Sequence, residues 1–163
     1  MTHAELVQYA EKWLSSRVGF SFNDRMRAYT QEFPDVIGFR QWWTVIIECK
    51  ISRADFLADA KKPHRVRVQQ GIRKGMGNYR LYACPTGLIK PEELPEKWGL
   101  LYFSEGGRCK AIINPLDMQG AVLRAPYVFD ADRQEEMNMM YSALRRLHLR
   151  GRIPEIYGPG WQE

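Results

Sequence analysis

Hydrophobic side chains recur along this chain at two spacings, which predict where helices and strands lie. Between residues 3 and 16 they fall three and four positions apart, and Thr2 with Glu5 has the spacing of a capping box. Residues 131–149 repeat the helical spacing, with an apolar face made of Met137, Met140, Leu144 and Leu147. We therefore expect one helix near each end of the chain.

Between these helices, short runs of β-branched and aromatic residues predict strands. The clearest run is 43–50, where side chains alternate between two faces, so that Glu48 and Lys50 share the face of Ile46. The other face, with Val45, Ile47 and Cys49, is expected to join the core. Further strands are expected within 18–29 and at 35–40, 79–84, 99–103 and 110–113.

The connections complete a prediction of fold class. Ser52 is placed to cap a helix after the strand 43–50, and Pro63 is expected to stop that helix. Residues 73–78 are expected to form a basic loop, and residues 151–163 an irregular tail. We therefore expect an α/β (α+β) protein with a central mixed β-sheet flanked by helices, in a single domain of residues 1–163.

Composition agrees with a globular chain. Of 163 residues, 45% are hydrophobic and 26% are charged, and no stretch approaches the roughly 20 apolar residues that cross a bilayer. The start of the chain lacks the pattern of a signal peptide. Cys49, Cys84 and Cys109 are odd in number and lack metal-ligand spacing. These features predict reduced cysteines in a cytoplasmic protein without a membrane partner.

Positive charge is concentrated in one part of the chain. The net charge is +5, and residues 61–80 contain seven Lys and Arg residues but no Asp or Glu. Such clustering suits the phosphate backbone of DNA, although a solvated basic face is the alternative. The candidate phosphate contacts are Lys61, Lys62, Arg65, Arg67, Arg73 and Lys74.

Candidate chemistry lies at the end of the strand 43–50. If residues 35–40 form a hairpin with that strand, Asp35 lies opposite its end, near Glu48. Two carboxylates, with the backbone carbonyl of Cys49, offer the oxygen ligands that Mg²⁺ prefers. Lys50 could orient or help deprotonate a metal-bound water, or stabilise charge on a scissile phosphate. The alternative is a surface hairpin on which Glu48 and Lys50 form an ordinary salt bridge.

Pro34-Asp35 followed by Glu48-Cys49-Lys50 resembles the motif of the PD-(D/E)XK nuclease superfamily. The resemblance covers about residues 30–85 and is strongest to small prokaryotic or phage-borne members linked to DNA processing or repair. It implies a restriction-endonuclease-like core and a helix beside the active site. It also implies that Asp35 and Glu48 bind Mg²⁺, with Mn²⁺ as a substitute, and that Lys50 serves the catalytic water.

Members of this superfamily often carry a further acid on the first helix, and here Glu5 and Glu11 are the candidates. Glu11 is preferred because it is nearer the end of the helix, whereas Glu32 precedes a strand. Asp55 and Asp59, on the helix after the motif, are expected to lie on its solvated face.

Three functions are therefore weighed. The first is a metal-dependent endonuclease that hydrolyses DNA, in DNA repair or phage DNA processing. The second is a nucleic-acid-binding module on the same fold without catalysis. The third is an interaction protein, including a homodimer, whose partner surface contains Met137, Met139 and Met140. The aromatic residues Trp42, Trp43 and Tyr79 are expected to pack rather than to stack on bases.

Overall fold

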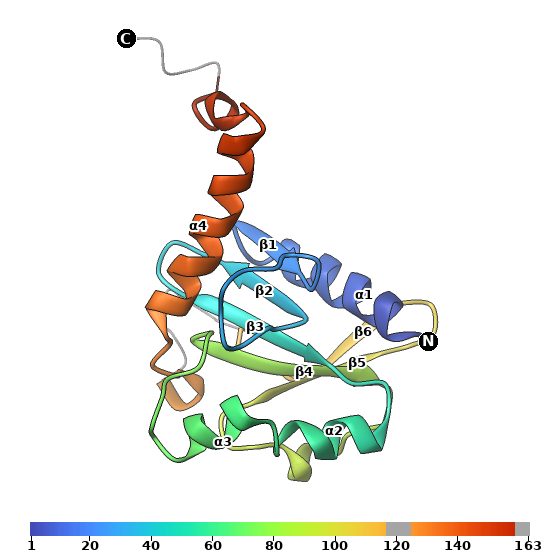
Figure 1. Cartoon of the computed structure of the whole chain (residues 1–163). Coiled ribbons are helices and arrows are strands. Elements are labelled where there is room, and N and C mark those ends of the chain that lie inside the picture. The colour runs from blue at the N-terminus through green and yellow to red at the C-terminus, as the bar shows by residue number, and fades with distance from the viewer. Residues whose placement is uncertain (117–124, 159–163) are drawn as a thin grey trace.

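The computed structural model describes residues 1–116 and 125–158, and it shows a six-stranded sheet with helices on both faces (Figure 1). The strands follow one another across the sheet in chain order. They are β1 (Phe20–Asn23), β2 (Val36–Phe39), β3 (Thr44–Cys49), β4 (Tyr79–Pro85), β5 (Gly99–Phe103) and β6 (Cys109–Ile113).

The sheet is mixed, as the sequence predicts. Strand β3 pairs in parallel with β4, and β4 pairs in parallel with β5, whereas the other neighbours are antiparallel. The parallel step from β3 to β4 requires a crossover, which contains the helices α2 (Arg53–Asp59) and α3 (Pro63–Gln69). The α/β class with a mixed sheet is therefore confirmed.

Helix α1 (His3–Ser15) begins at the predicted capping box, in which Thr2 and Glu5 bond each other's backbone N–H groups. The side chain of Ser52 caps α2 by accepting a hydrogen bond from the N–H of Asp55. Pro63 does not simply stop a helix, because it opens α3 at the first helical position, where its missing N–H costs nothing. Part of the basic segment is thus helical.

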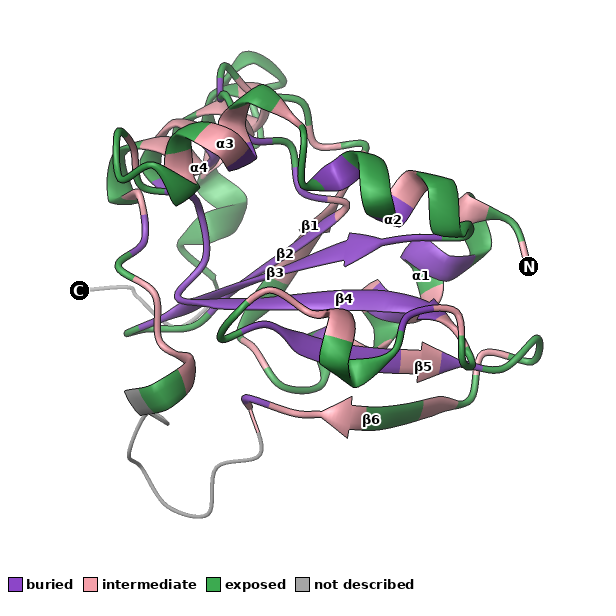
Figure 2. Ribbon diagram, turned by 90° about the horizontal axis from the view of Figure 1, so that it is seen from below, coloured by how far each residue is buried: buried purple, intermediate pink, exposed green. Residues whose placement is uncertain are grey.

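Two hydrophobic clusters lie on the two faces of the sheet. On one face α1 packs against residues that include Val45, Ile47 and Cys49, and on the other Phe56 of α2 packs near Ile46. All of β3 is buried, and Figure 2 shows the central strands as the most buried part of the molecule. The predicted alternation along β3 is confirmed, and it places Glu48 and Lys50 on the α2 face.

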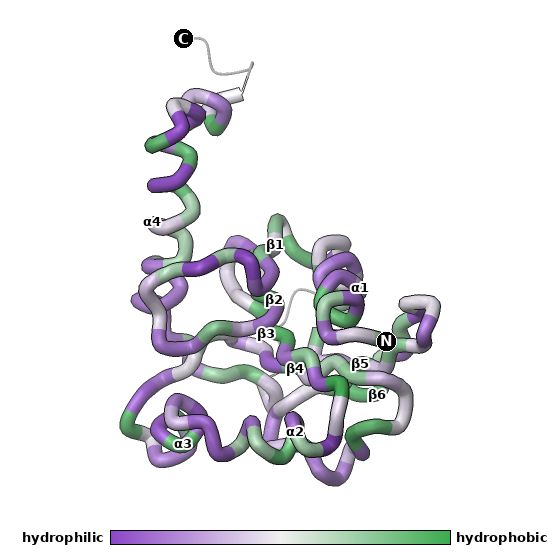
Figure 3. The backbone as a smooth tube through the Cα atoms, turned by 45° about the vertical axis from the view of Figure 1, so that its right-hand side comes forward, coloured by the Kyte–Doolittle hydropathy of each residue, from purple (hydrophilic) through white to green (hydrophobic). Residues whose placement is uncertain are grey.

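Helix α4 (Arg133–Leu149) projects away from the sheet, and its far half lies beyond the body of the protein (Figures 1 and 3). Its first turn is anchored by the buried carboxylate of Glu136, which accepts hydrogen bonds from the Thr44 hydroxyl at 2.6 Å and from the Gly77 N–H at 3.0 Å. Met139 is buried in the core, whereas Met137 is 62% exposed.

The remaining described elements are short 3₁₀ helices at Pro91–Glu93, Ala125–Tyr127 and Ile153–Ile156. The last of these gives the predicted irregular tail one regular turn, and residues 159–163 of that tail lie outside the described residues. Within the described ranges, no helix has both the length and the apolar character to cross a membrane.

Candidate functional site

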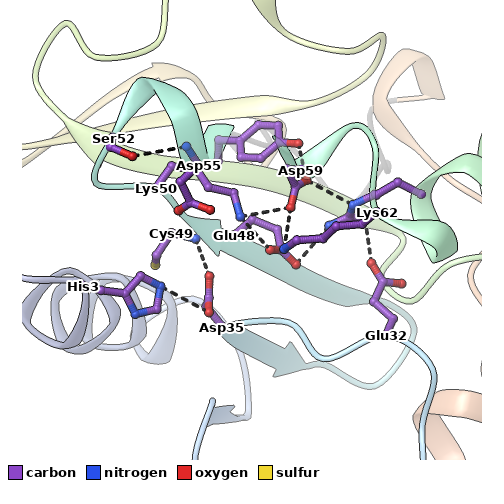
Figure 4. Close-up of polar contacts among 12 residues, drawn as sticks. His3, Glu32, Asp35, Glu48, Cys49, Lys50, Ser52, Asp55, Asp59 and Lys62 are labelled. Atoms are coloured by element: carbon purple, nitrogen blue, oxygen red, sulfur yellow. Dashed lines mark hydrogen bonds and ion pairs between the residues drawn. The ribbon is translucent and has the colours of Figure 1, made fainter. Parts of the chain in front are cut away.

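The antiparallel pairing of β2 with β3 brings the two halves of the motif together. Val36 pairs with Ile47, so Asp35, directly before β2, lies at the same end of the sheet as Glu48. A carboxylate oxygen of Asp35 accepts a hydrogen bond from the N–H of Cys49 at 2.7 Å (Figure 4). The hairpin register that the sequence predicts is therefore present.

Glu48 and Lys50 are buried, with 3% and 2% of their surfaces exposed. The ammonium of Lys50 donates a hydrogen bond to Oε2 of Glu48 at 3.3 Å, and Oε1 of Glu48 pairs with a guanidinium nitrogen of Arg65 at 2.9 Å. The alternative predicted an exposed salt bridge between Glu48 and Lys50. The salt bridge is present, but it is buried, so the predicted exposure is wrong. Removing one partner of a buried pair is costly, since the other charge remains without compensation.

Asp59 is the second carboxylate partner of Lys50, at 3.0 Å, and it also pairs with Lys62 at 2.8 Å. Its other oxygen accepts a hydrogen bond from the hydroxyl of Tyr82 at 2.8 Å. The expectation that Asp59 faces solvent is wrong, because α2 buries the face that carries Phe56 and Asp59. The sequence already indicated this burial, because residues three apart on a helix share a face and Phe56 is apolar.

Arg65 from α3 connects the acids of three segments. Its guanidinium pairs with Glu32 at 2.6 Å, with Glu48 at 2.9 Å and with Asp59 at 3.3 Å, and only 5% of the residue is exposed. A contact to DNA phosphate would require Arg65 to face solvent, so this prediction is wrong for Arg65. It acts as an internal counter-ion instead.

Glu32 joins this group, whereas Glu11 does not. Glu32 accepts hydrogen bonds from Arg65 at 2.6 Å and from the N–H of Met76 at 2.7 Å. Glu11, on α1, accepts a hydrogen bond at 2.7 Å from the side chain of Asn23 on β1. The preference for Glu11 as an additional acid thus has no support in the structure. No local sequence signal marks Glu32, because its partners lie more than thirty residues away.

We refer to these side chains as the charge cluster, which contains three carboxylates and three basic groups. Its members are Glu32, Glu48, Lys50, Asp59, Lys62 and Arg65.

Burial and charge shift the pKa values of the cluster in different directions. Burial raises the pKa of Glu48 to about 7, against the opposing effect of Arg65 and Lys50. Burial also disfavours the charged form of Lys50, but the carboxylates of Glu48 and Asp59 outweigh it and hold the pKa of Lys50 above its ordinary value. Lys50 is therefore protonated at neutral pH, which favours the charge-stabilising role over that of a base.

The other predicted phosphate contacts divide by exposure. Lys61 and Arg67 are exposed, and Lys74 is exposed but pairs with Asp130 at 2.7 Å. Arg73 is half-buried, with a nitrogen 3.8 Å from a carboxylate oxygen of Glu135. Lys62 is half-buried on Asp59, as described above.

Two of the three aromatic candidates pack in the core, as expected. Trp43 and Tyr79 are buried and meet edge to face, with ring centroids 5.5 Å apart. Trp42 is 74% exposed, so the expectation that it packs is wrong.

The described part of the chain contains no group of three or more His, Cys, Asp or Glu side chains arranged to hold a metal ion. Asp35 and Glu48 nevertheless share one end of the sheet, and the charge of Asp35 contributes to the raised pKa of Glu48. Both groups offer hard oxygen atoms, and so does the backbone carbonyl of Cys49 between Glu48 and Lys50. This donor chemistry fits Mg²⁺ rather than a soft metal.

Comparisons with known proteins add evidence on the fold. No family model matches the chain, and no match is found among curated proteins. The structure is similar to that of a protein of unknown function from Silicibacter pomeroyi, with a TM-score of 0.56 and 22% sequence identity. The match covers 100% of this chain and 99% of the other. Similarity at this identity shows a common fold and nothing about function.

Proposed function

We propose that this protein is a metal-dependent nuclease, an endonuclease that hydrolyses phosphodiester bonds of DNA in DNA repair or phage DNA processing. The proposal rests chiefly on the buried Glu48–Lys50 pair at the end of β3, beside Asp35. Buried ionisable groups with shifted pKa values are costly to keep, and they are found preferentially at functional sites. The same residues carry the resemblance to the PD-(D/E)XK superfamily.

In this proposal Asp35 and Glu48, with the carbonyl oxygen of Cys49, hold Mg²⁺, and Mn²⁺ is a substitute. The bound ion would lower the pKa of a water molecule and polarise a phosphoryl oxygen. Lys50 remains an ammonium and stabilises negative charge that develops on the scissile phosphate.

Two neighbours support these groups. Asp59 is a positioning residue, because its pair with Lys50 at 3.0 Å helps to hold the ammonium beside Glu48. Arg65 balances the charge of Glu48 from α3. The exposed cations next to the cluster in sequence, Lys61 and Arg67, are the proposed contacts to the DNA backbone. We place the activity in the cytoplasm, since Cys49, Cys84 and Cys109 are unpaired.

One observation favours the second function, a nucleic-acid-binding module without catalysis. Both carboxylate oxygens of Glu48 already pair with cations, Lys50 at 3.3 Å and Arg65 at 2.9 Å. A metal ion must compete with Lys50 and Arg65 for the oxygens of Glu48. If the metal ion never displaces these cations, the protein would bind DNA without cutting it.

A cleavage assay separates the two functions. The wild type, Glu48→Gln and Lys50→Met are incubated with duplex, single-stranded, flapped and branched DNA in Mg²⁺ or Mn²⁺. We expect metal-dependent cleavage by the wild type and a loss of about 100-fold or more in each variant, because Glu48→Gln loses a proposed metal ligand and Lys50→Met loses the ammonium at the phosphate. Circular dichroism checks that each variant is folded.

Matched controls are Glu92→Gln and Lys110→Met, which change an exposed acid and an exposed base outside the cluster. Both should cleave at the wild-type rate. Cleavage that persists in folded Glu48→Gln and Lys50→Met contradicts the assignment of these residues. DNA binding without cleavage of any substrate in either metal supports the binding module instead.

A further inference from the structure

A pocket of about 470 Å³ lies on the same side of the sheet as the charge cluster, bounded by α3, β4 and the segment before β5. Arg65 forms the wall between the two, since it pairs with Glu48 and also lies 4.7 Å from the centre of the Trp98 ring. The volume is in the range of sites for small organic ligands. The pocket is therefore a separate space next to the candidate catalytic groups.

Arg80, on β4, lines this pocket and forms no ion pair with any residue that the structure describes. Only 2% of the residue is exposed, and its buried Nε has no hydrogen-bond partner in the described part of the chain. Its guanidinium carbon lies 4.4 Å from the centre of the Phe129 ring. Burial lowers the pKa of Arg80, although an arginine still remains charged. Arg80 thus differs from Arg65, which pairs with three carboxylates.

The carboxylates whose charges reach Arg80, those of Glu32, Glu136 and Glu48, are already bonded elsewhere. Glu32 accepts from Arg65 and from a backbone N–H. Glu136 accepts from a threonine hydroxyl, from a backbone N–H and from Arg133. An unpaired buried charge is costly, and an oxyanion of a ligand would compensate it with a bidentate contact.

Three aromatic residues, Tyr82, Trp98 and Phe129, form part of the remaining walls. Trp98 and Tyr82 stack with centroids 4.4 Å apart and an angle of 20° between their planes, and Phe129 lies across the pocket. Glu96 also lines the pocket, and the ammonium of Lys97 lies 5.9 Å from the Phe129 ring. Aromatic side chains beside one guanidinium without an ion pair suit a ligand that has a planar ring and an anionic group.

We propose that this pocket binds a phosphate-bearing planar ligand of the nucleoside monophosphate class, with the phosphate on Arg80 and the ring against the aromatic walls. The same chemistry is present in a free nucleotide and at the phosphorylated end of a DNA strand. Binding uses neither Asp35 nor Glu48, so it stands independently of the proposed nuclease activity.

Calorimetric titration of the purified protein with adenosine 5′-monophosphate tests this site. Adenosine and inorganic phosphate, which each supply half of the ligand, should bind at least about tenfold more weakly. Arg80→Met should weaken binding of the nucleotide by at least about tenfold. Glu92→Gln, at an exposed acid that does not line the pocket, should leave it unchanged.

The stability of Arg80→Met provides a second readout. Methionine has a similar length and no charge to desolvate, so the melting temperature of the ligand-free variant should equal or exceed that of the wild type. Ala60→Trp fills the pocket from the end of α2 and keeps Arg80, so it should also abolish nucleotide binding. Arg108→Met, at an exposed arginine on the β5–β6 turn, is the matched control and should bind normally.

The two ligand sources are separated with one oligonucleotide that carries either a 5′ phosphate or a 5′ hydroxyl. Tighter binding of the phosphorylated strand than of the mononucleotide identifies a strand end, and the reverse order identifies a free nucleotide. The proposal is overturned if the wild type does not bind the nucleotide at millimolar concentration. It is also overturned if Arg80→Met and Ala60→Trp bind like the wild type. If Arg80→Met does not fold, Ala60→Trp decides the question alone.

Discussion

Single residues of the candidate site are unusual in how completely their charges are buried. Glu48, Lys50 and Asp59 are each at most 3% exposed, and each meets an opposite charge within 3.3 Å. A buried ion pair contributes little net stability, because desolvation of the ions offsets their attraction. Selection for stability alone would favour apolar residues at these positions, so their charge supports a functional role.

Asp59→Asn is predicted to destabilise the protein by about 3–5 kcal/mol at neutral pH, because Lys50 and Lys62 lose their shared carboxylate. Burial opposes ionisation of Asp59, but the neighbouring cations outweigh it and hold its pKa below the ordinary 3.8. Its stabilising effect is therefore fully present above that value and is lost as the pH falls through the lower folded-state pKa. The difference in unfolding free energy between variant and wild type should shrink in acid.

Urea denaturation at several pH values between neutrality and strong acid measures this difference. Asp130→Asn is the control, because Asp130 forms an ion pair with Lys74 in which both side chains are largely exposed. It should change stability by less than about 1 kcal/mol at any pH. A difference for Asp59→Asn that does not vary with pH would show that the charge of Asp59 is not what stabilises the cluster.

Among the elements, β2 and β3 connect the core with the site. Strand β3 is buried throughout, and its paired neighbour β2 places Asp35 beside it. Helix α1 lies close to β2 because Gly38 leaves no side chain between them. A Cβ atom at Gly38 would lie 2.8 Å from a methyl carbon of Leu14.

Gly38→Ala is therefore predicted to destabilise the protein by about 1–3 kcal/mol, since the added methyl group must displace Leu14 or shift α1. Denaturant unfolding, followed by circular dichroism, measures the loss. Gly106→Ala serves as the control because a Cβ atom there meets no other atom within 4 Å. Equal stability of the two variants would contradict the close packing of α1 on β2.

Over the whole molecule, charge and exposed apolar surface are distributed unevenly. The net charge is +5, and exposed cations such as Lys61 and Arg67 lie next to the charge cluster in sequence. On the projecting α4, Met137 and Tyr141 are exposed by 62% and 65%. A homodimer or another partner on this helix stays a prediction, which light scattering tests.

If the exposed cations contact DNA, they should set the salt dependence of binding. Glu48→Gln serves as the background, to prevent cleavage. In it, Lys61→Gln and Arg67→Gln should each make the negative slope of log K for DNA binding against log salt concentration shallower by about 0.9. Fluorescence anisotropy with a labelled duplex measures the slope. Lys110→Gln, on the edge strand β6, should leave it unchanged. An unaltered slope in the first two variants would remove these residues from the DNA interface.

The sequence by itself determined the features that depend on neighbouring residues. Alternation along β3 placed Glu48 and Lys50 on one face, and the caps Thr2 and Ser52 marked the starts of α1 and α2. The position of Asp35 followed only on the condition that residues 35–40 and 43–50 form a hairpin in the right register, which the structure shows. These features are local, so a short window of sequence is enough to predict them.

Only the tertiary structure decided which charges meet. Glu32, Asp59 and Arg65 come from a loop and two helices, and their contacts depend on how the crossover from β3 to β4 packs on the sheet. The same packing buried Arg80 and left its Nε without a hydrogen bond to any described residue. Periodicity shows which face of an element is apolar, but it does not show which distant element covers that face. Burial and pairing of charge depend on that covering element.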